Sequence, residues 1–129
     1  MRHSLISDFM SNLDNAARKG KREIVFRPYS KLIGNILGLL KERGYVEEYE
    51  IFEDGRGGGF RIRLSPHINR CGPIMPHFPV KYKELEKWEK RYLPALNFGF
   101  LIMTTNRGIM ASDQAKRERV GGRLLAYIY

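Results

Sequence analysis

Short hydrogen-bonding side chains follow a long apolar run near the carboxyl end of the chain. The run covers residues 98–103, and the polar residues after it are Thr104, Thr105, Asn106, Arg107 and Gly108. We expect these residues to form a sharp turn between two buried strands. Hydroxyls, amides, guanidinium groups and backbone N–H groups all bind phosphates and base edges in nucleic-acid complexes. The same residue types are common in ordinary β-turns, so the segment alone leaves both interpretations open.

A second group of chemically capable residues comprises His67, Cys71 and His77. A structural zinc site needs four ligands in paired short spacings, whereas this group has three and the chain has no second cysteine. A catalytic cysteine needs a positioned histidine and an electropositive pocket, and no orienting group is evident here. We therefore predict no metal, no cofactor and no catalytic residues, and we keep a small nucleic-acid-acting enzyme centred on this group as an alternative.

A glycine-rich stretch at residues 54–59 superficially suggests a phosphate-binding loop. It lacks the G-x-G-x-x-G spacing and leads into a predicted strand rather than a helix, so the motif fails on its context. We predict a hairpin turn instead.

The first half of the chain alternates helical and extended patterns. We expect a helix from Ser4 to about Lys19, a strand at 22–27, a helix capped by Ser30 and ended by Gly44, and a hairpin of 45–53 with 60–64. In the hairpin, alternating residues place Arg61 and Arg63 opposite several glutamates, which predicts cross-strand ion pairs. Two helices on one face of a small sheet would form an α/β layer.

A change in composition near residues 66–70 suggests a boundary between units 1–66 and 67–129. Three prolines within 72–82 predict an irregular segment with at most one short edge strand. The expected elements that follow are a helix at 82–91, a linker at 93–96, strands at 98–104 and 109–110, a helix at 112–119 and a central strand at 123–129. Burial of this last strand should bring Gly121 and Gly122 close to the polar turn.

The fold class that follows from these elements is α+β, with two small domains. The amino-terminal domain is an αβαββ layer, and the carboxy-terminal domain is mostly antiparallel β with short helices.

The charge of the chain points to a polyanionic partner. Lys and Arg total 23 against 14 Asp and Glu, the formal net charge is +9, and the sequence pI is about 9.9. The basic residues are dispersed over several segments, which suits a structured RNA better than a membrane surface. Aromatic residues that could stack on unpaired bases are Tyr29, Tyr82, Trp88 and Tyr92, and we expect at least two of them to cover the core instead.

Cysteine usage and hydropathy indicate the compartment. The single cysteine, Cys71, allows no intramolecular disulfide and favours a reducing, intracellular location, for which we expect the cytoplasm. No apolar run approaches the ~18 residues of a spanning helix. The amino terminus lacks the apolar block of a signal peptide, so we expect no membrane partner.

Several motifs, in order along the chain, resemble the small-subunit ribosomal protein eight family, the universal primary rRNA-binding proteins. The matching segments are Gly20-Lys21, 27–31, Gly44-Tyr45, 53–56, 104–110, 114–117 and 121–127. Segments 69–74, 86–88 and 93–95 resemble the archaeal and eukaryotic branch rather than the bacterial one.

The resemblance implies a structural component of the small ribosomal subunit. It would bind and stabilise a helical junction in the central domain of the small-subunit rRNA during assembly and translation. Its partners would be this rRNA and neighbouring small-subunit proteins, with no small-molecule substrate. A free regulatory RNA-binding protein that represses a messenger is the alternative within the same class.

The resemblance also implies which residues touch the RNA. In the family the polar loop is Ser-Thr-Ser-like, and here Thr104, Thr105 and Asn106 take those places, followed by Arg107 and Gly108. The loop with Ser30 and Lys31 would supply a second contact from the amino-terminal half. Gly121 and Gly122 would support the polar loop and let RNA approach closely.

Overall fold

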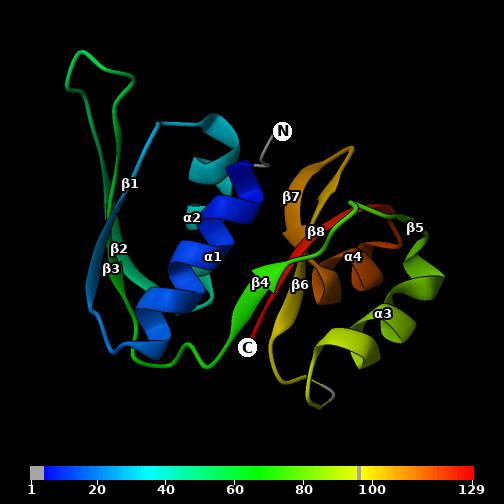
Figure 1. The fold of residues 1–129 in the computed structure, drawn as a ribbon. Helices are drawn as coiled ribbons and strands as arrows, with labels where there is room; N and C mark the ends of the chain where they lie inside the picture. Colours follow the sequence, from blue (N-terminus) through cyan, green and yellow to red (C-terminus); the bar gives the residue numbers. More distant parts are fainter. Residues whose placement is uncertain (1–4, 96) are drawn as a thin grey trace.

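The computed structural model describes residues 5–95 and 97–129 (Figure 1). The first half contains α1 (Leu5–Arg18), β1 (Glu23–Phe26), α2 (Lys31–Glu42), β2 (Val46–Phe52) and β3 (Gly59–Leu64). The second half contains β4 (Cys71–Pro73), β5 (Pro79–Val80), the 3-10 helix η1 (Tyr82–Glu84), α3 (Leu85–Tyr92), β6 (Phe100–Thr105), β7 (Gly108–Ala111), α4 (Ser112–Glu118) and β8 (Gly122–Ile128). The predicted helix start at Ser4 and the predicted linker end at Leu96 lie outside the described residues.

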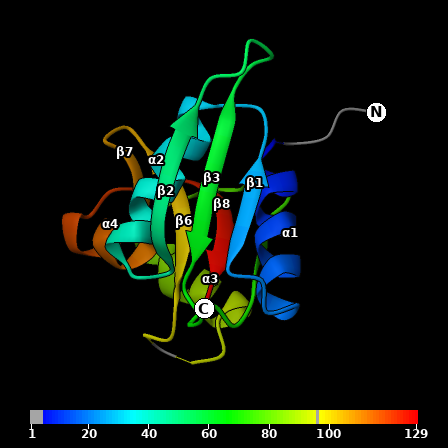
Figure 2. The ribbon, with the colours of Figure 1, turned by 90° about the vertical axis from the view of Figure 1, so that its left-hand side faces the viewer.

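The first sheet is antiparallel in the order β1-β3-β2, and α1 and α2 cover one of its faces (Figure 2). Phe60, Ile62 and Leu64 of β3 are buried on the helix side, while Arg61 and Arg63 are exposed on the other. The predicted layer and the predicted alternation of β3 are therefore confirmed.

The start of α2 is fixed by Ser30. This residue has an extended backbone, and its hydroxyl accepts a hydrogen bond from the N–H of Ile33 at 3.4 Å. Such a cap satisfies one of the backbone donors that a helix start leaves free. Lys31, the first helical residue, is exposed.

The glycine-rich stretch between β2 and β3 forms the predicted hairpin turn. The Asp54 carboxylate accepts hydrogen bonds from the N–H groups of Arg56 and Gly58, at 2.8 and 3.0 Å. These bonds and the ion pair with Arg27 hold the pKa of Asp54 below its ordinary value, the backbone bond from Arg56 contributing most.

The second sheet has the order β4-β8-β6-β7, and β5 also pairs with β8. The carboxy-terminal strand is thus interior, as predicted. The prediction of at most one short strand in 72–82 is wrong, since β4 pairs with the end of β8 and β5 with its start. The free edge of β8 is long enough to take both strands in turn, with the proline-containing stretch 74–78 between them.

The elements form four layers, in which α1 and α2 lie between the two sheets while α3 and α4 cover the far face of the second sheet (Figure 1). One core joins the inner helices to both sheets and contains Phe9, Ile36, Phe60, Ile102 and Ile128. A second core fills the space between the second sheet, α3 and α4. The α+β class is confirmed. The division into units 1–66 and 67–129 stays a prediction, and it falls where the chain passes from one sheet to the other.

Candidate nucleic-acid interface

The polar turn is tighter than the sequence suggested. Thr105 of β6 pairs with Gly108 of β7, so the turn itself consists of Asn106 and Arg107. Thr104 and Thr105 lie in the strand because the ladder of hydrogen bonds continues to its end. Gly108 has a φ of 104°, a left-handed conformation that favours glycine.

Internal contacts make this turn stiff. The Thr105 hydroxyl donates to the carbonyl of Gly108 and accepts from the N–H of Arg107, each at 3.0 Å. The Arg107 guanidinium forms an ion pair with Glu118 of α4, at 3.0 Å. Hydrogen bonds from Gln114 and then Arg107 hold the pKa of Glu118 below its ordinary value. Asn106 is exposed, and its side chain has no partner among the described residues. Its amide is therefore available to an external partner on a turn whose backbone is held in place.

Gly122 lies directly beside this turn, as predicted, since it pairs with Thr105 of β6, and Gly121 precedes it against Val80 of β5. A Cβ atom on Gly122 would lie 2.0 Å from the carbonyl oxygen of Thr104, and one on Gly121 would lie 2.5 Å from that of Val80. Both contacts are with backbone oxygens of paired strands, which cannot move away without breaking the pairing of the strands. The two glycines are therefore needed, first of all, for the close passage of the protein's own chain.

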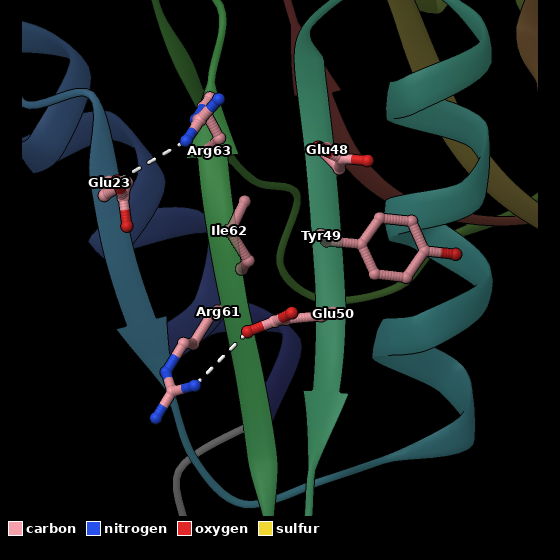
Figure 3. Close-up of a pocket in the computed structure, with 7 residues that line it drawn as sticks. All are labelled: Glu23, Glu48, Tyr49, Glu50, Arg61, Ile62 and Arg63. Carbon is pink, nitrogen blue, oxygen red and sulfur yellow. Dashed lines mark hydrogen bonds and ion pairs between the residues drawn. The ribbon is translucent and has the colours of Figure 1, made fainter.

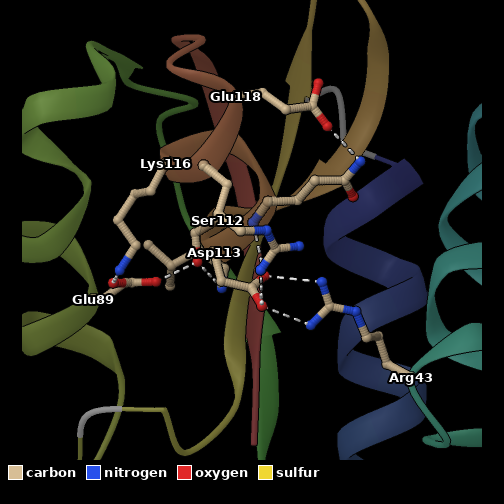
Figure 4. A network of polar contacts seen from close by, with 9 residues as sticks. Arg43, Glu89, Ser112, Asp113, Lys116 and Glu118 are labelled. Atoms are coloured by element: carbon tan, nitrogen blue, oxygen red, sulfur yellow. Dashed lines mark hydrogen bonds and ion pairs between the residues drawn. The ribbon is translucent and has the colours of Figure 1, made fainter.

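A buried polar network fixes the position of α4 (Figure 4). α4 in turn contacts the polar turn through the ion pair of Glu118 with Arg107. Glu89 of α3 is 8% exposed and accepts from the Ser112 hydroxyl at 2.5 Å, while Lys116 lies 2.5 Å from its other oxygen. The Ser112 hydroxyl accepts in turn from the N–H of Leu101 in β6, at 3.1 Å. The start of α4 is thus hydrogen-bonded to both α3 and β6.

A second link joins α4 to the amino-terminal half. Arg43, at the end of α2, contacts both carboxylate oxygens of Asp113, at 3.0 and 2.9 Å (Figure 4). Burial raises the pKa of Asp113, but Arg43 and the N–H of Gln114 outweigh burial and hold this pKa below its ordinary value. A bidentate contact also fixes orientation, so α4 and α2 keep one relative position.

The amino end of α2 and the turn between β6 and β7 point toward the same end of the molecule (Figures 1 and 2). α2 also packs against β7. Lys31 is exposed, and within residues 5–95 and 97–129 no side chain pairs with its charge. The structure therefore brings Ser30 and Lys31 to the end that carries the polar turn.

Comparison with known proteins decides the family. The family model for ribosomal protein S8 matches residues 4–129. The chain belongs to the ribosomal protein S8 family. Relatives named small ribosomal subunit protein uS8, from Thermoplasma volcanium and Thermoplasma acidophilum, are each 46% identical over 129 residues and align over 100% of both chains. The one from Methanoregula boonei is 47% identical over 128 residues, covering 99% of this chain and 98% of the relative.

Membership of the S8 family confirms the family predicted from the motifs, and the archaeal sources of these relatives agree with the predicted branch. It also confirms that the chain is not an enzyme, since the family consists of ribosomal proteins. Among the described residues, no helix is long and apolar enough to cross a membrane.

His67, Cys71 and His77, the group on which the alternative enzyme was centred, do not form a catalytic or metal site in this S8 chain. Cys71 is 2% exposed, and burial is the main cause that raises the pKa of its thiol to about 12. A thiol with this pKa is almost wholly protonated near neutral pH and is a poor nucleophile. His77 contacts the carbonyl of Ile74 at 3.0 Å rather than the thiol. Within the described part of the chain, no three His, Cys, Asp or Glu residues are placed to share a metal ion.

Most of the candidate stacking residues cover the second core, as expected for at least two of them. Trp88 and Tyr92 stack at 6.4 Å between ring centroids, Tyr92 stacks on Tyr127 at 5.5 Å, and Tyr82 packs against the same core. Tyr29 is the exception, since it rests on Phe60 and is 43% exposed.

The open face of the first sheet carries Arg–Glu ion pairs (Figure 3). The predicted pairing within the hairpin is confirmed for Arg61, which lies 3.2 Å from Glu50 of β2. Arg63 instead lies 3.9 Å from Glu23 of β1, the strand on the other side of β3. These carboxylates offset the charge of the arginines locally and make this face of the sheet unfavourable for a polyanion.

Residues 67–129, in contrast, contain 11 of the 23 basic residues and only five of the 14 acidic residues. The second half therefore has the stronger positive potential.

Proposed function

We propose that this protein is a component of the small ribosomal subunit, where it binds and stabilises a helical junction in the central domain of the small-subunit rRNA during assembly and translation. Its partners are this rRNA and neighbouring small-subunit proteins, in the cytoplasm. Relatives that align over the full chain carry the name of a small-subunit protein, which supports this assignment.

We place the main RNA contact at the polar turn. The observation that carries this proposal is that Asn106 is exposed on a turn in which the side chains of Thr105 and Arg107 are already bonded within the protein. A preorganised group loses little conformational entropy when it binds, so its hydrogen bonds contribute more of their energy to affinity. Gly121 and Gly122 flank the turn without side chains, and Ser30 and Lys31 supply the second contact from α2.

The action is architectural and involves no reaction. An RNA junction samples several geometries, and a ligand that binds one of them better than the others shifts the population toward it. The amide of Asn106 and the backbone around the turn would read the irregular RNA surface, while Lys31 would neutralise phosphate. Because phosphate neutralisation releases counterions, affinity should fall as salt rises.

Replacing both Thr105 and Asn106 by alanine tests this placement. The change removes the outward amide and the hydroxyl that shapes the turn, and each lost hydrogen bond to a charged or polar RNA group costs roughly 1–2 kcal/mol. We expect at least a tenfold loss of affinity for a transcript of the rRNA central domain, measured by filter binding at fixed salt. Circular dichroism should show a folded protein.

Asn12→Ala is the matched control, since Asn12 is an exposed residue of α1 and its loss should leave RNA affinity unchanged. Equal affinity of the double variant and the parent at the same salt would rule out the polar turn as the main contact.

A further inference from the structure

Arg119 has a backbone conformation that is unusual for an arginine. It follows the last residue of α4 with φ 58° and ψ 43°, in the left-handed region. Its N–H bonds back to the carbonyl of Lys116 at 3.3 Å, and that of Val120 bonds to Ala115 at 3.0 Å. Glycine is the usual residue at this place in a helix end because its lack of a Cβ avoids the strain.

The position of Arg119 relates it to the proposed RNA contact. The residue before it, Glu118, is ion-paired with Arg107 in the polar turn. Three residues after it, Gly122 pairs with Thr105 at the end of β6. Arg119 therefore lies on a short connection whose two ends both touch the hairpin of β6 and β7.

The basic side chains near Arg119 already form ion pairs or hydrogen bonds within the protein. The contacts are Arg107 with Glu118 at 3.0 Å, Lys116 with Glu89 at 2.5 Å, Arg117 with Asp113 at 3.7 Å, and Arg123 with the carbonyl of His77 at 3.2 Å. Arg119 is exposed, and no described residue pairs with its guanidinium. Its full charge and its five donors are thus available to an external anion.

We propose that Arg119 is a phosphate-binding residue of the RNA interface, retained where glycine would give a more stable helix end. The inference rests on the proposed function and adds to it a contact outside the polar turn. The phosphate would belong to the rRNA backbone beside the bases that the turn reads, since a lone guanidinium recognises phosphate through charge and forked hydrogen bonds.

A purely structural role for Arg119 leads to a different expectation. A cation at the carboxyl end of a helix stabilises the helix dipole, so Arg119 could serve α4 alone. In that case Arg119→Gly would lower the Tm and leave RNA binding unchanged. In the role proposed here, the same variant keeps or raises the Tm and weakens binding.

The test measures Tm and RNA affinity for Arg119→Gly and Arg119→Lys, with a transcript of the small-subunit rRNA central domain as the probe over a range of salt concentrations. For Arg119→Gly we expect the Tm to stay or rise by a few degrees. We expect its affinity to fall about three- to tenfold and the salt slope to decrease by about one. Arg119→Lys should keep most of the slope because it keeps the charge.

Lys19→Gln is the control for net charge. Lys19 is exposed and follows α1, whose carboxyl end lies at the end of the molecule opposite to the polar turn (Figure 1). Its loss should change affinity less than that of Arg119. An equal loss would overturn the inference, as would parental affinity and slope in Arg119→Gly. If the parent itself binds the transcript no better than an unrelated RNA duplex of equal length, the proposed function fails as well.

Discussion

Replacing Gly122 by alanine is expected to weaken both the fold and RNA binding. The added Cβ would lie 2.0 Å from the Thr104 carbonyl oxygen and 3.1 Å from the Cα of Thr105. The pairing of β8 with β6 must open beside the polar turn to relieve this overlap. Overpacking of this kind costs about 1–3 kcal/mol or more. We expect a clear fall in the free energy of unfolding, measured in urea, and at least a tenfold loss of RNA affinity.

Gly34→Ala is the matched control for this substitution. A Cβ on Gly34 would meet the Phe60 ring at 3.7 Å, which is ordinary van der Waals contact, and the residue lies inside α2. Alanine there should leave stability unchanged or raise it by up to about 1 kcal/mol through helix propensity. Parental stability and affinity in Gly122→Ala would show that the approach of the two strands is not required.

Replacing Glu89 by alanine is expected to destabilise the second half of the protein. The change leaves the buried Ser112 hydroxyl without its hydrogen-bond acceptor and Lys116 without its counterion. Removing one partner of a buried ion pair costs about 3–5 kcal/mol, and the partial exposure of Lys116 reduces this to roughly 2–3 kcal/mol. For a chain of this length the Tm should fall by several degrees.

Glu86→Ala, on the same helix, provides the comparison. Glu86 is exposed and lies 3.8 Å from Lys90, an ion pair of a type that contributes under about 0.5 kcal/mol. Thermal unfolding should therefore separate the two variants clearly. If both lower the Tm equally, the network around Ser112 does not stabilise the attachment of α4.

Local chemistry made much of the fold predictable. The cap at Ser30, the alternation of Arg61 and Arg63, and the turn at Asp54 each depend on residues close in sequence. The placement of Gly122 beside the polar turn followed from the apolar character of the last strand, which predicted an interior position.

The contacts that hold α4 could not be predicted in this way. Arg43 and Asp113 are separated by 70 positions, and Glu89 and Ser112 by 23, so no periodicity relates them. In the sequence, nothing distinguishes Glu89 from the exposed glutamates Glu84 and Glu86, and its burial depends on tertiary packing. The predicted strand ended one residue too early, at 104, because a threonine such as Thr105 is equally compatible with a turn and with a strand end.

The most direct measurement is a cryo-EM structure of the small ribosomal subunit that contains this protein. We expect rRNA within hydrogen-bonding distance of Asn106, with Gly121 and Gly122 against the same RNA junction and Lys31 near a phosphate. A subunit in which the turn between β6 and β7 faces solvent or another protein, while rRNA contacts a different surface, would rule out the polar turn as the RNA contact.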